Sequence, residues 1–385
     1  MNSPTVSFVV PCHRLAHLLP ECIHSILAQT YSDFEVLIMD DCSPDNTPDV
    51  AASFDDPRVK YVRNEHNLGH LRNYNKGIEL SRGKYVWLIS ADDYLRQPYI
   101  LERYVSLMDS HPQVGFTFCP GVGVTGNSAG ASLEYTFYRP YDVVVNGHVF
   151  LEELLNLNIV LAPSAIVRRE CYDRLGLFPL NAMWAGQPVE MGWAGDWYLW
   201  CLFSLFFDVG YFAEPMVCYR LHNLSMTDAL TQRHKVDSCA AADIAIPWLI
   251  RQRALECGIQ DVARHSLKAI AHQYARQLSS TQYRSATSRM SVEQFEESLS
   301  RSTPSETDRN WIRARVFSAV ADALFAQGDL AEAKRFYVLA LKRNPGMLRT
   351  VTKLILLCSG APGRMIRRII RTLSRKATGA PLTSG

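Results

Sequence analysis

Long apolar runs are absent from this sequence of 385 residues. No stretch reaches the roughly 18 uninterrupted apolar residues of a membrane-spanning helix. The longest candidate, Trp197–Phe207, is flanked by Asp196 and Asp208, so it predicts a buried helix. The N-terminal residues lack both the basic segment and the apolar segment of a signal peptide. We therefore expect a cytoplasmic protein.

Several chemical motifs are also missing. The ten cysteines form no CxxC pair and no zinc spacing, and there is no HExxH and no Walker loop. These absences argue against a zinc site and a P-loop nucleotidase. Gly121–Gly126 matches GxGxxG and Gly126–Gly130 matches GxSxG, but residues 127–130 disfavour the helix that both motifs require. A nicotinamide site and a serine hydrolase are therefore not expected.

Acidic residues are absent from the C-terminal end. Lys342–Gly385 carries ten Lys and Arg and no Asp or Glu, which leaves 30 basic against 38 acidic residues in the rest. Within it, Arg364–Lys376 has one apolar helical face and a basic remainder. At about 1.5 Å per residue this segment is too short to cross a bilayer, so it predicts a helix on an anionic membrane surface. The alternative is that its apolar face packs on preceding helices. No nucleic-acid partner is expected, because the rest of the chain is acidic.

Strands and helices alternate over the first 120 residues. Five apolar runs predict strands: Val6–Val10, Phe34–Met39, Val59–Arg63, Tyr85–Ile89 and Val114–Cys119. Four segments between them have helical character: Leu15–Gln29, Pro48–Ser53, Leu71–Ser81 and Tyr99–Ser110. This alternation predicts an α/β fold with a mainly parallel central sheet. Ligands bind at the carboxyl ends of the strands in such sheets.

The chain beyond residue 228 is expected to be helical throughout. We therefore predict three regions. Residues 1–228 form the α/β domain, residues 229–305 form a helical linker region, and residues 306–385 form a second helical region. The last region contains residues spaced as in one tetratricopeptide repeat: Phe317, Ala321, Leu324, Gly328, Ala333, Tyr337, Ala340 and Pro345. An ordinary helical hairpin fits equally well. A single repeat cannot bury its own face, so this region could bind a protein partner or a second copy of the chain.

Two pairs of adjacent acids follow predicted strands. Asp40-Asp41 comes directly after Phe34–Met39, and Asp92-Asp93 comes shortly after Tyr85–Ile89. Both pairs are therefore expected at the ligand-binding edge of the sheet. A divalent cation or a nucleotide that offers donors relieves the repulsion between such acids. Either pair alone also fits solvated loop residues.

Eleven short motifs follow one another between residues 6 and 222. They are Val6–Pro11, Ser25–Tyr31, Ile38–Ser43, Asn67–Gly69, Arg72-Asn73, Gly83–Leu88, Ala91–Asp93, Ser164–Arg169, Gly176–Phe178, Gly195-Asp196 and Tyr219–His222. In this order and spacing the sequence closely resembles the family 2 glycosyltransferases of the GT-A fold, over about residues 4–228. The resemblance does not extend to the helical part.

The resemblance implies roles for individual residues. Asp41 would receive the nucleotide base, with Pro11 and His13 lining that pocket. Arg72 would lie near the base or diphosphate, and Asp92 would approach the ribose.

It also implies the catalytic apparatus. Asp93 would hold Mg²⁺ or Mn²⁺, with His222 near the metal or diphosphate, and Asp196 would be the catalytic base. The alternative for Asp196 is an N-cap, and for His222 a structural histidine. Ser90, Gly195 and His13-Arg14 depart from the family's usual residues, so the nucleotide stays open.

The resemblance implies a metal-dependent, inverting glycosyltransferase. It would move one sugar from a nucleotide-sugar donor to a glycan or lipid-linked acceptor, in cell-surface polysaccharide synthesis. The Trp- and Gly-rich region Pro163–Trp197 would shape the acceptor pocket, since aromatic faces suit sugar rings. The alternative is a non-catalytic adaptor that binds a nucleotide sugar and acts through its helical region.

Overall fold

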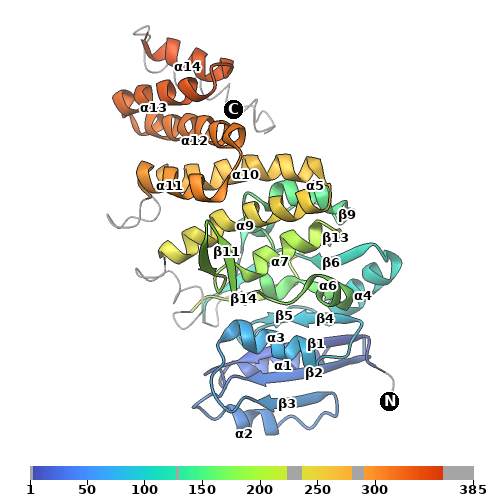
Figure 1. Cartoon of the computed structure of the whole chain (residues 1–385). Coiled ribbons are helices and arrows are strands. Elements are labelled where there is room, and N and C mark those ends of the chain that lie inside the picture. Colours follow the sequence, from blue (N-terminus) through green and yellow to red (C-terminus); the bar gives the residue numbers. More distant parts are fainter. Residues whose placement is uncertain (1–2, 127–129, 223–235, 280–289, 359–385) are drawn as a thin grey trace. The chain divides into compact units, whose positions relative to one another are not determined.

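The computed structural model describes residues 3–126, 130–222, 236–279 and 290–358. The chain divides into two compact units (Figure 1). The first comprises Met1–Ala182, Pro188–Ile246 and Gln252–Val262, and the second comprises Met183–Gln187, Pro247–Arg251 and Ala263–Gly385. The predicted boundary at 228 lies in the stretch 223–235, outside the described residues, and the three predicted domains stay predictions.

A parallel four-stranded group forms the N-terminal half of the main sheet. Its strands are β1 (Val6–Cys12), β2 (Phe34–Asp40), β3 (Val59–Arg63) and β4 (Tyr85–Leu88). Their order in the sheet is β3-β2-β1-β4, and every pairing is parallel. All residues of β1 and β2 are buried, as their near-continuous apolar sequences indicate. The first four predicted strands are confirmed to within two residues at each end.

The other half of the main sheet is mixed, which the sequence did not indicate. β10 (Ile166–Arg168) inserts antiparallel between β4 and β6 (Val114–Phe118). β13 (Asp208–Tyr211) then pairs parallel with β6, and β9 (Val143–Val145) forms the antiparallel edge. The completed sheet has eight strands in the order β3-β2-β1-β4-β10-β6-β13-β9.

A second sheet of four short strands flanks the predicted site, because β5 (Tyr94–Leu95) directly follows Asp93 and His222 lies shortly after β14 (Val217–Arg220). Its order is β5-β14-β7-β8, completed by β7 (Gly121–Val124) and β8 (Ala131–Ser132). Residues 121–124 of the GxGxxG segment thus form strand β7. A separate hairpin pairs β11 (Asn181–Trp184) with β12 (Gln187–Glu190).

Helices flank the main sheet in the first unit (Figure 1). They are α1 (Leu19–Leu27), α2 (Thr47–Ala52), α3 (His70–Leu80), α4 (Ile100–Ser110), α5 (Gly147–Leu154), α6 (Arg169–Leu175) and α7 (Gly195–Ser204), with 3₁₀ turns η1 (Glu134–Thr136) and η2 (Ala162–Ser164). Helix α3 packs closely on β1 and β2. A Cβ on Gly77 would stand 2.4 Å from Val9 Cγ1, so only glycine permits this approach. Helix α7 is buried along most of its length, as predicted for Trp197–Phe207.

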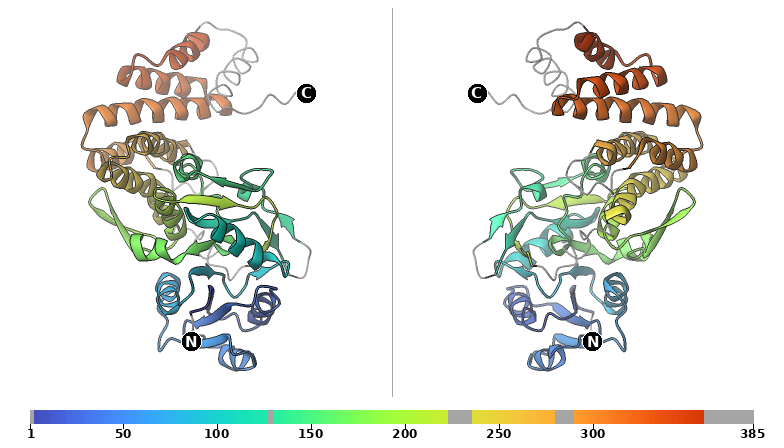
Figure 2. Two further views of the ribbon diagram at one scale, coloured as in Figure 1. Left: turned by 90° about the vertical axis from the view of Figure 1, so that its right-hand side faces the viewer. Right: turned by 90° about the vertical axis from the view of Figure 1, so that its left-hand side faces the viewer.

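Helices make up most of the described residues 236–279 and 290–358. They are α9 (Val236–Glu256), α10 (Gln260–Ser279), α11 (Val292–Ser302), α12 (Glu306–Gln327), α13 (Leu330–Arg343) and α14 (Leu348–Cys358). Helices α12, α13 and α14 lie side by side (Figure 2). Gly328 ends α12 with a φ of +92°, a left-handed conformation that suits glycine. The helical hairpin is confirmed, whereas its assignment as a tetratricopeptide unit stays a prediction.

The basic tail Arg364–Lys376 lies outside the described residues, so its placement on a membrane stays a prediction. Among the helices that are described, none combines the length and apolarity needed to cross a bilayer.

Candidate nucleotide-sugar site

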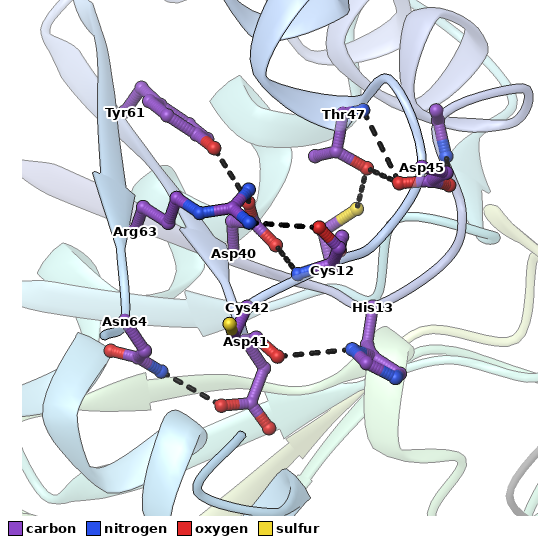
Figure 3. Close-up of polar contacts among 12 residues, drawn as sticks. Cys12, His13, Asp40, Asp41, Cys42, Asp45, Thr47, Tyr61, Arg63 and Asn64 are labelled. Atoms are coloured by element: carbon purple, nitrogen blue, oxygen red, sulfur yellow. Dashed lines mark hydrogen bonds and ion pairs between the residues drawn. The ribbon is translucent and has the colours of Figure 1, made fainter. Parts of the chain in front are cut away.

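Asp40 and Asp41 are adjacent in sequence but have different surroundings (Figure 3). Asp40 is fully buried at the end of β2 and accepts hydrogen bonds from Tyr61 Oη at 2.6 Å, Arg63 Nη1 at 2.8 Å and Ser43 N at 2.8 Å. Burial and the bond to Asp40 raise the pKa of Tyr61 to about 12. Asp40 therefore joins β2 to β3 and serves the fold.

Asp41 organises the segment that leads into α3. Its Oδ1 accepts from Leu68 N at 2.7 Å and from Asn64 Nδ2 at 2.9 Å, and its Oδ2 accepts from Gly69 N at 3.0 Å. These bonds fix residues 64–69 beside the carboxyl ends of β1 and β2. The predicted contact of Asp41 with a nucleotide base stays a prediction.

Three further predicted residues surround Asp41. Pro11 lies near the end of β1, and His13 Nδ1 lies 3.0 Å from the carbonyl oxygen of Asp41. Arg72 is exposed in the first turn of α3, where its Nη1 donates to Leu68 O at 3.4 Å. The structure thus brings the predicted base-binding residues to one sheet edge.

Arg220 ties the second acidic pair into the fold. Its backbone N donates to Asp93 Oδ1 at 3.0 Å, and its Nε donates to the carbonyl oxygen of Asp92 at 3.1 Å. Its Nη1 donates to Gly126 O at 3.1 Å, and its Nη2 pairs with Glu21. The side chain is 8% exposed. Arg220 therefore joins β14, the Asp92-Asp93 turn, the end of β7 and helix α1.

The two carboxylates beside Arg220 are only partly compensated by neighbouring donors and charges. Asp93 is buried, and its pKa is raised by that burial and by the charge of Asp92. Asp92 Oδ2 lies 2.9 Å from His222 Nε2, whereas its Oδ1 is buried and accepts no hydrogen bond from the described residues. An acceptor atom without a donor inside a protein is costly. A cation or a hydroxyl donor from a ligand would complete this group.

These residues fit a divalent cation that is shared with a ligand. The described residues contain no group of three or more His, Cys, Asp or Glu side chains that could hold a metal by themselves. Mg²⁺ in proteins is commonly bound by one or two carboxylates together with phosphate oxygens and water. Asp93, with Asp92 and His222 beside it, matches that donor set.

Asp196 lies in the first turn of α7. Its Oδ1 accepts from Trp197 N at 2.7 Å, and its Oδ2 accepts from Asn158 Nδ2 at 3.4 Å. Burial raises its pKa to about 6, against the opposing effect of these bonds. The N-cap of α7 is Ala194, without a side-chain cap, so the alternative that Asp196 is the cap is wrong.

Tyr74 of helix α3 packs among other rings. Burial raises its pKa, and the negative charges of Asp92, Asp196 and Asp93 raise it further. Its ring packs edge-on against His70 and Phe178, with centroids 5.6 Å apart in each pair. His70 Nε2 in turn lies 3.0 Å from the carbonyl oxygen of Gly192, just before α7. Through Tyr74 and His70, helix α3 therefore contacts Phe178 and the residues just before α7.

Three residues of this region received no role from the sequence. Arg220 stood inside the quoted motif Tyr219–His222, and a basic residue beside acids could have suggested its function. Tyr74 lies one residue beyond Arg72-Asn73 and carries no pattern of its own. Asn158 contacts Asp196 across 38 positions of sequence, and no local pattern indicates such a contact.

Comparison with known proteins supplies a family for part of the chain. Residues 7–170 match the family described as Glycosyl transferase family 2. Glycosyltransferase GlyG of Streptococcus pneumoniae is 31% identical over 114 residues, which cover 29% of this chain and 38% of GlyG. The succinoglycan biosynthesis protein ExoO of Rhizobium meliloti is 36% identical over 107 residues, covering 28% and 30%. The matched part thus covers only 30–38% of the length of these relatives.

Solved structures are similar over a longer stretch. The structure of S. aureus TarS 1-349 in complex with UDP has a TM-score of 0.57 at 18% identity, and covers 89% of this chain and 92% of that one. The complex with UDP-GlcNAc has a TM-score of 0.58 at 17% identity, with the same coverage. At this identity the similarity establishes the fold.

Arg220 provides a test of how the site is built. We predict that Arg220→Met lowers the free energy of unfolding by about 2 kcal/mol or more, because Asp92 O and Gly126 O lose a buried donor. The measurement is urea denaturation. Arg96→Met is the matched control, since Arg96 is exposed and close by in sequence to the same turn, and it should change stability by less than about 0.5 kcal/mol. Equal stability of the two variants would show that Arg220 does not support the turn.

Proposed function

Because residues 7–170 form a family 2 glycosyl transferase domain, we propose that the chain transfers one sugar from a nucleotide-diphosphate sugar to a hydroxyl group of a glycan or glycoconjugate, with inversion at the anomeric carbon. The observation that carries this proposal, beside the family match, is the Asp92-Asp93 turn, where Asp93 is buried and Asp92 Oδ1 is buried without a hydrogen-bond donor among the described residues. A single displacement at the anomeric carbon needs acidic groups that bind the donor and its metal ion. It also needs a separate carboxylate, here Asp196, that acts as the base for the acceptor hydroxyl.

The donor would bind along the edge formed by β1, β2 and the Asp92-Asp93 turn. Asp41, held by Leu68 N and Gly69 N, would face the base beside Pro11 and His13. Asp92 has a buried oxygen without a donor among the described residues, which a ribose hydroxyl could supply. Arg72 is exposed at the start of α3, where it could approach the base or diphosphate.

Asp93 and His222 would hold Mg²⁺ or Mn²⁺ at the diphosphate. Such an ion supplies positive charge that stabilises the departing nucleoside diphosphate. Arg220 keeps the Asp93 carboxylate in place through its backbone N–H. The raised pKa of Asp93 supports this role, since a nearby cation favours the ionised form that burial disfavours.

Asp196 would remove the proton of the acceptor hydroxyl. As that oxygen bonds to the anomeric carbon, the bond from this carbon to the diphosphate oxygen breaks and the proton passes to Asp196. Its pKa of about 6 makes it a stronger base than an ordinary carboxylate, while it stays largely ionised at neutral pH. Asn158 and the amide of Trp197 donate to its two oxygens and so would orient it.

The relatives suggest which substrates to test first. TarS was solved with UDP and with UDP-GlcNAc, so UDP is the first nucleotide to try. ExoO and TuaG are named for succinoglycan and teichuronic acid biosynthesis, which supports a surface polysaccharide as the acceptor. The region Pro163–Trp197, which contains Asp196, would contribute to the acceptor pocket.

The metal role predicts a specific loss in an Asp93 variant. Mn²⁺ should strengthen UDP binding by the wild type, whereas Asp93→Asn should bind UDP with the same affinity in the presence and absence of Mn²⁺. Isothermal titration calorimetry measures both. Asp109→Asn, an exposed carboxylate in α4, is the control and should keep the response. If UDP binding by Asp93→Asn still strengthened with Mn²⁺, the metal would be bound elsewhere.

The role of Asp196 predicts a loss of transfer without a loss of donor binding. Asp196→Asn should lower kcat by about 10² or more and leave the Kd for UDP unchanged. In the wild type, kcat/KM should fall as the pH drops below about 6, because protonation removes the base. The measurement is UDP release with acceptor over pH 4.5–8. A variant rate within a few-fold of wild type would place the base elsewhere, and no transfer by the wild type with any donor would favour the adaptor.

A further inference from the structure

An exposed aromatic segment follows strand β8. In residues 135–141, Tyr135 is 50% exposed, Phe137 42% and Tyr141 60%. Exposed aromatic rings gathered in seven residues are unusual and often mark binding surfaces. Tyr135 belongs to η1, and none of the roles described above uses it.

The turn that carries Tyr135 is firmly attached to β7. Leu133 N donates to Gly121 O at 3.0 Å, and Gly121 N donates to Thr136 Oγ1 at 3.1 Å. Thr136 is fully buried and its hydroxyl also donates to Leu133 O at 2.6 Å. The residues on both sides of Tyr135 are therefore fixed, and the Tyr135 ring is presented to solvent from an ordered base.

Asp196 is linked to Gly121 through a second segment, residues 158–161. It accepts from Asn158 Nδ2, and three residues later Leu161 covers Gly121, so that a Cβ there would stand 2.3 Å from Leu161 Cδ2. Gly121 thus lies between the 158–161 segment and the Tyr135 turn. Consistent with this, burial of part of the ring and the negative charge of Asp196 both raise the pKa of Tyr135.

We propose that the exposed ring of Tyr135 is the platform on which a sugar ring of the acceptor lies while its hydroxyl reaches Asp196. This rests on the proposed function, since Asp196 must contact the acceptor. The acceptor's remaining atoms then extend over the surface next to Asp196, where Tyr135 offers an apolar face with a polar end. The C–H faces of a pyranose match such a ring. The acceptor class is therefore a carbohydrate, and Tyr135 contributes to its affinity and not to proton transfer.

Three variants separate this role from a general effect on the surface. Tyr135→Ala removes the platform, and Tyr135→Phe keeps the ring but loses the hydroxyl. Tyr141→Ala is the matched control, because Tyr141 is at least as exposed and lies in the same segment. The probes are methyl glycosides of glucose, galactose, mannose and N-acetylglucosamine, titrated by NMR in the presence of UDP and Mg²⁺.

We expect at least one glycoside to bind the wild type, Tyr135→Phe and Tyr141→Ala with the same Kd, and to bind Tyr135→Ala about 2- to 12-fold more weakly, the range measured for aromatic contacts. An unchanged Kd in Tyr135→Ala, an equal loss in Tyr141→Ala, or no binding of any glycoside by the wild type would overturn the proposal. UDP affinity, measured separately in each variant, reports on the proposed function. Normal UDP binding with an unchanged glycoside Kd would contradict the platform alone.

Discussion

The site depends on the hydrogen bonds that the buried guanidinium of Arg220 donates to backbone carbonyl oxygens. The guanidinium lies beside two carboxylates whose charges repel each other, and it binds the carbonyl oxygens that shape their turn. Its own backbone N–H holds Asp93. Without this residue, β14, the Asp92-Asp93 turn and the end of β7 would have no shared buried donor. Asp93 can therefore remain buried, where the low polarity of the surroundings would strengthen its interaction with a cation.

Hydrogen-bond donors also decide the roles of Asp40, the last residue of β2, and of Asp41, which follows it. Asp40 is neutralised inside the protein by Arg63 and by the hydroxyl of Tyr61, so it fixes two strands. Asp41 is surrounded by amide donors of the next segment, so it fixes the loop that borders the proposed base pocket. Helix α3 then continues from this loop, and its Tyr74 and His70 contact Phe178 and the carbonyl oxygen of Gly192, which precedes α7. One stretch of chain thus connects the Asp41 loop to the segment that leads into α7.

The sequence predicted the parallel strands well because each is a buried apolar run followed by a polar turn. The GT-A fold expected from the motif order is confirmed, and so is the helical C-terminal region. The insertion of β10 was not predictable, since Ile166–Arg168 is three residues long and too short to show a period. The strands of the second sheet have two to four residues, and they were not predicted for the same reason.

The sequence analysis also missed side chains whose partners lie far away in the sequence. Asp196 was found by its motif, yet its partner Asn158 and the neighbouring Tyr135 come from segments with no recognisable pattern. Their positions follow from how β7, η1 and the 158–161 segment pack around Gly121. Such packing is a property of the folded chain and has no local sequence counterpart.

We propose that the Asp92-Asp93 turn holds the donor diphosphate together with a metal ion. An anomalous difference map at the manganese absorption edge, from crystals grown with UDP and Mn²⁺, tests this directly. We expect one strong peak within bonding distance of the Asp93 carboxylate and of the diphosphate oxygens. A diphosphate bound away from this turn, or a manganese peak that contacts neither Asp93 nor the diphosphate, would contradict it.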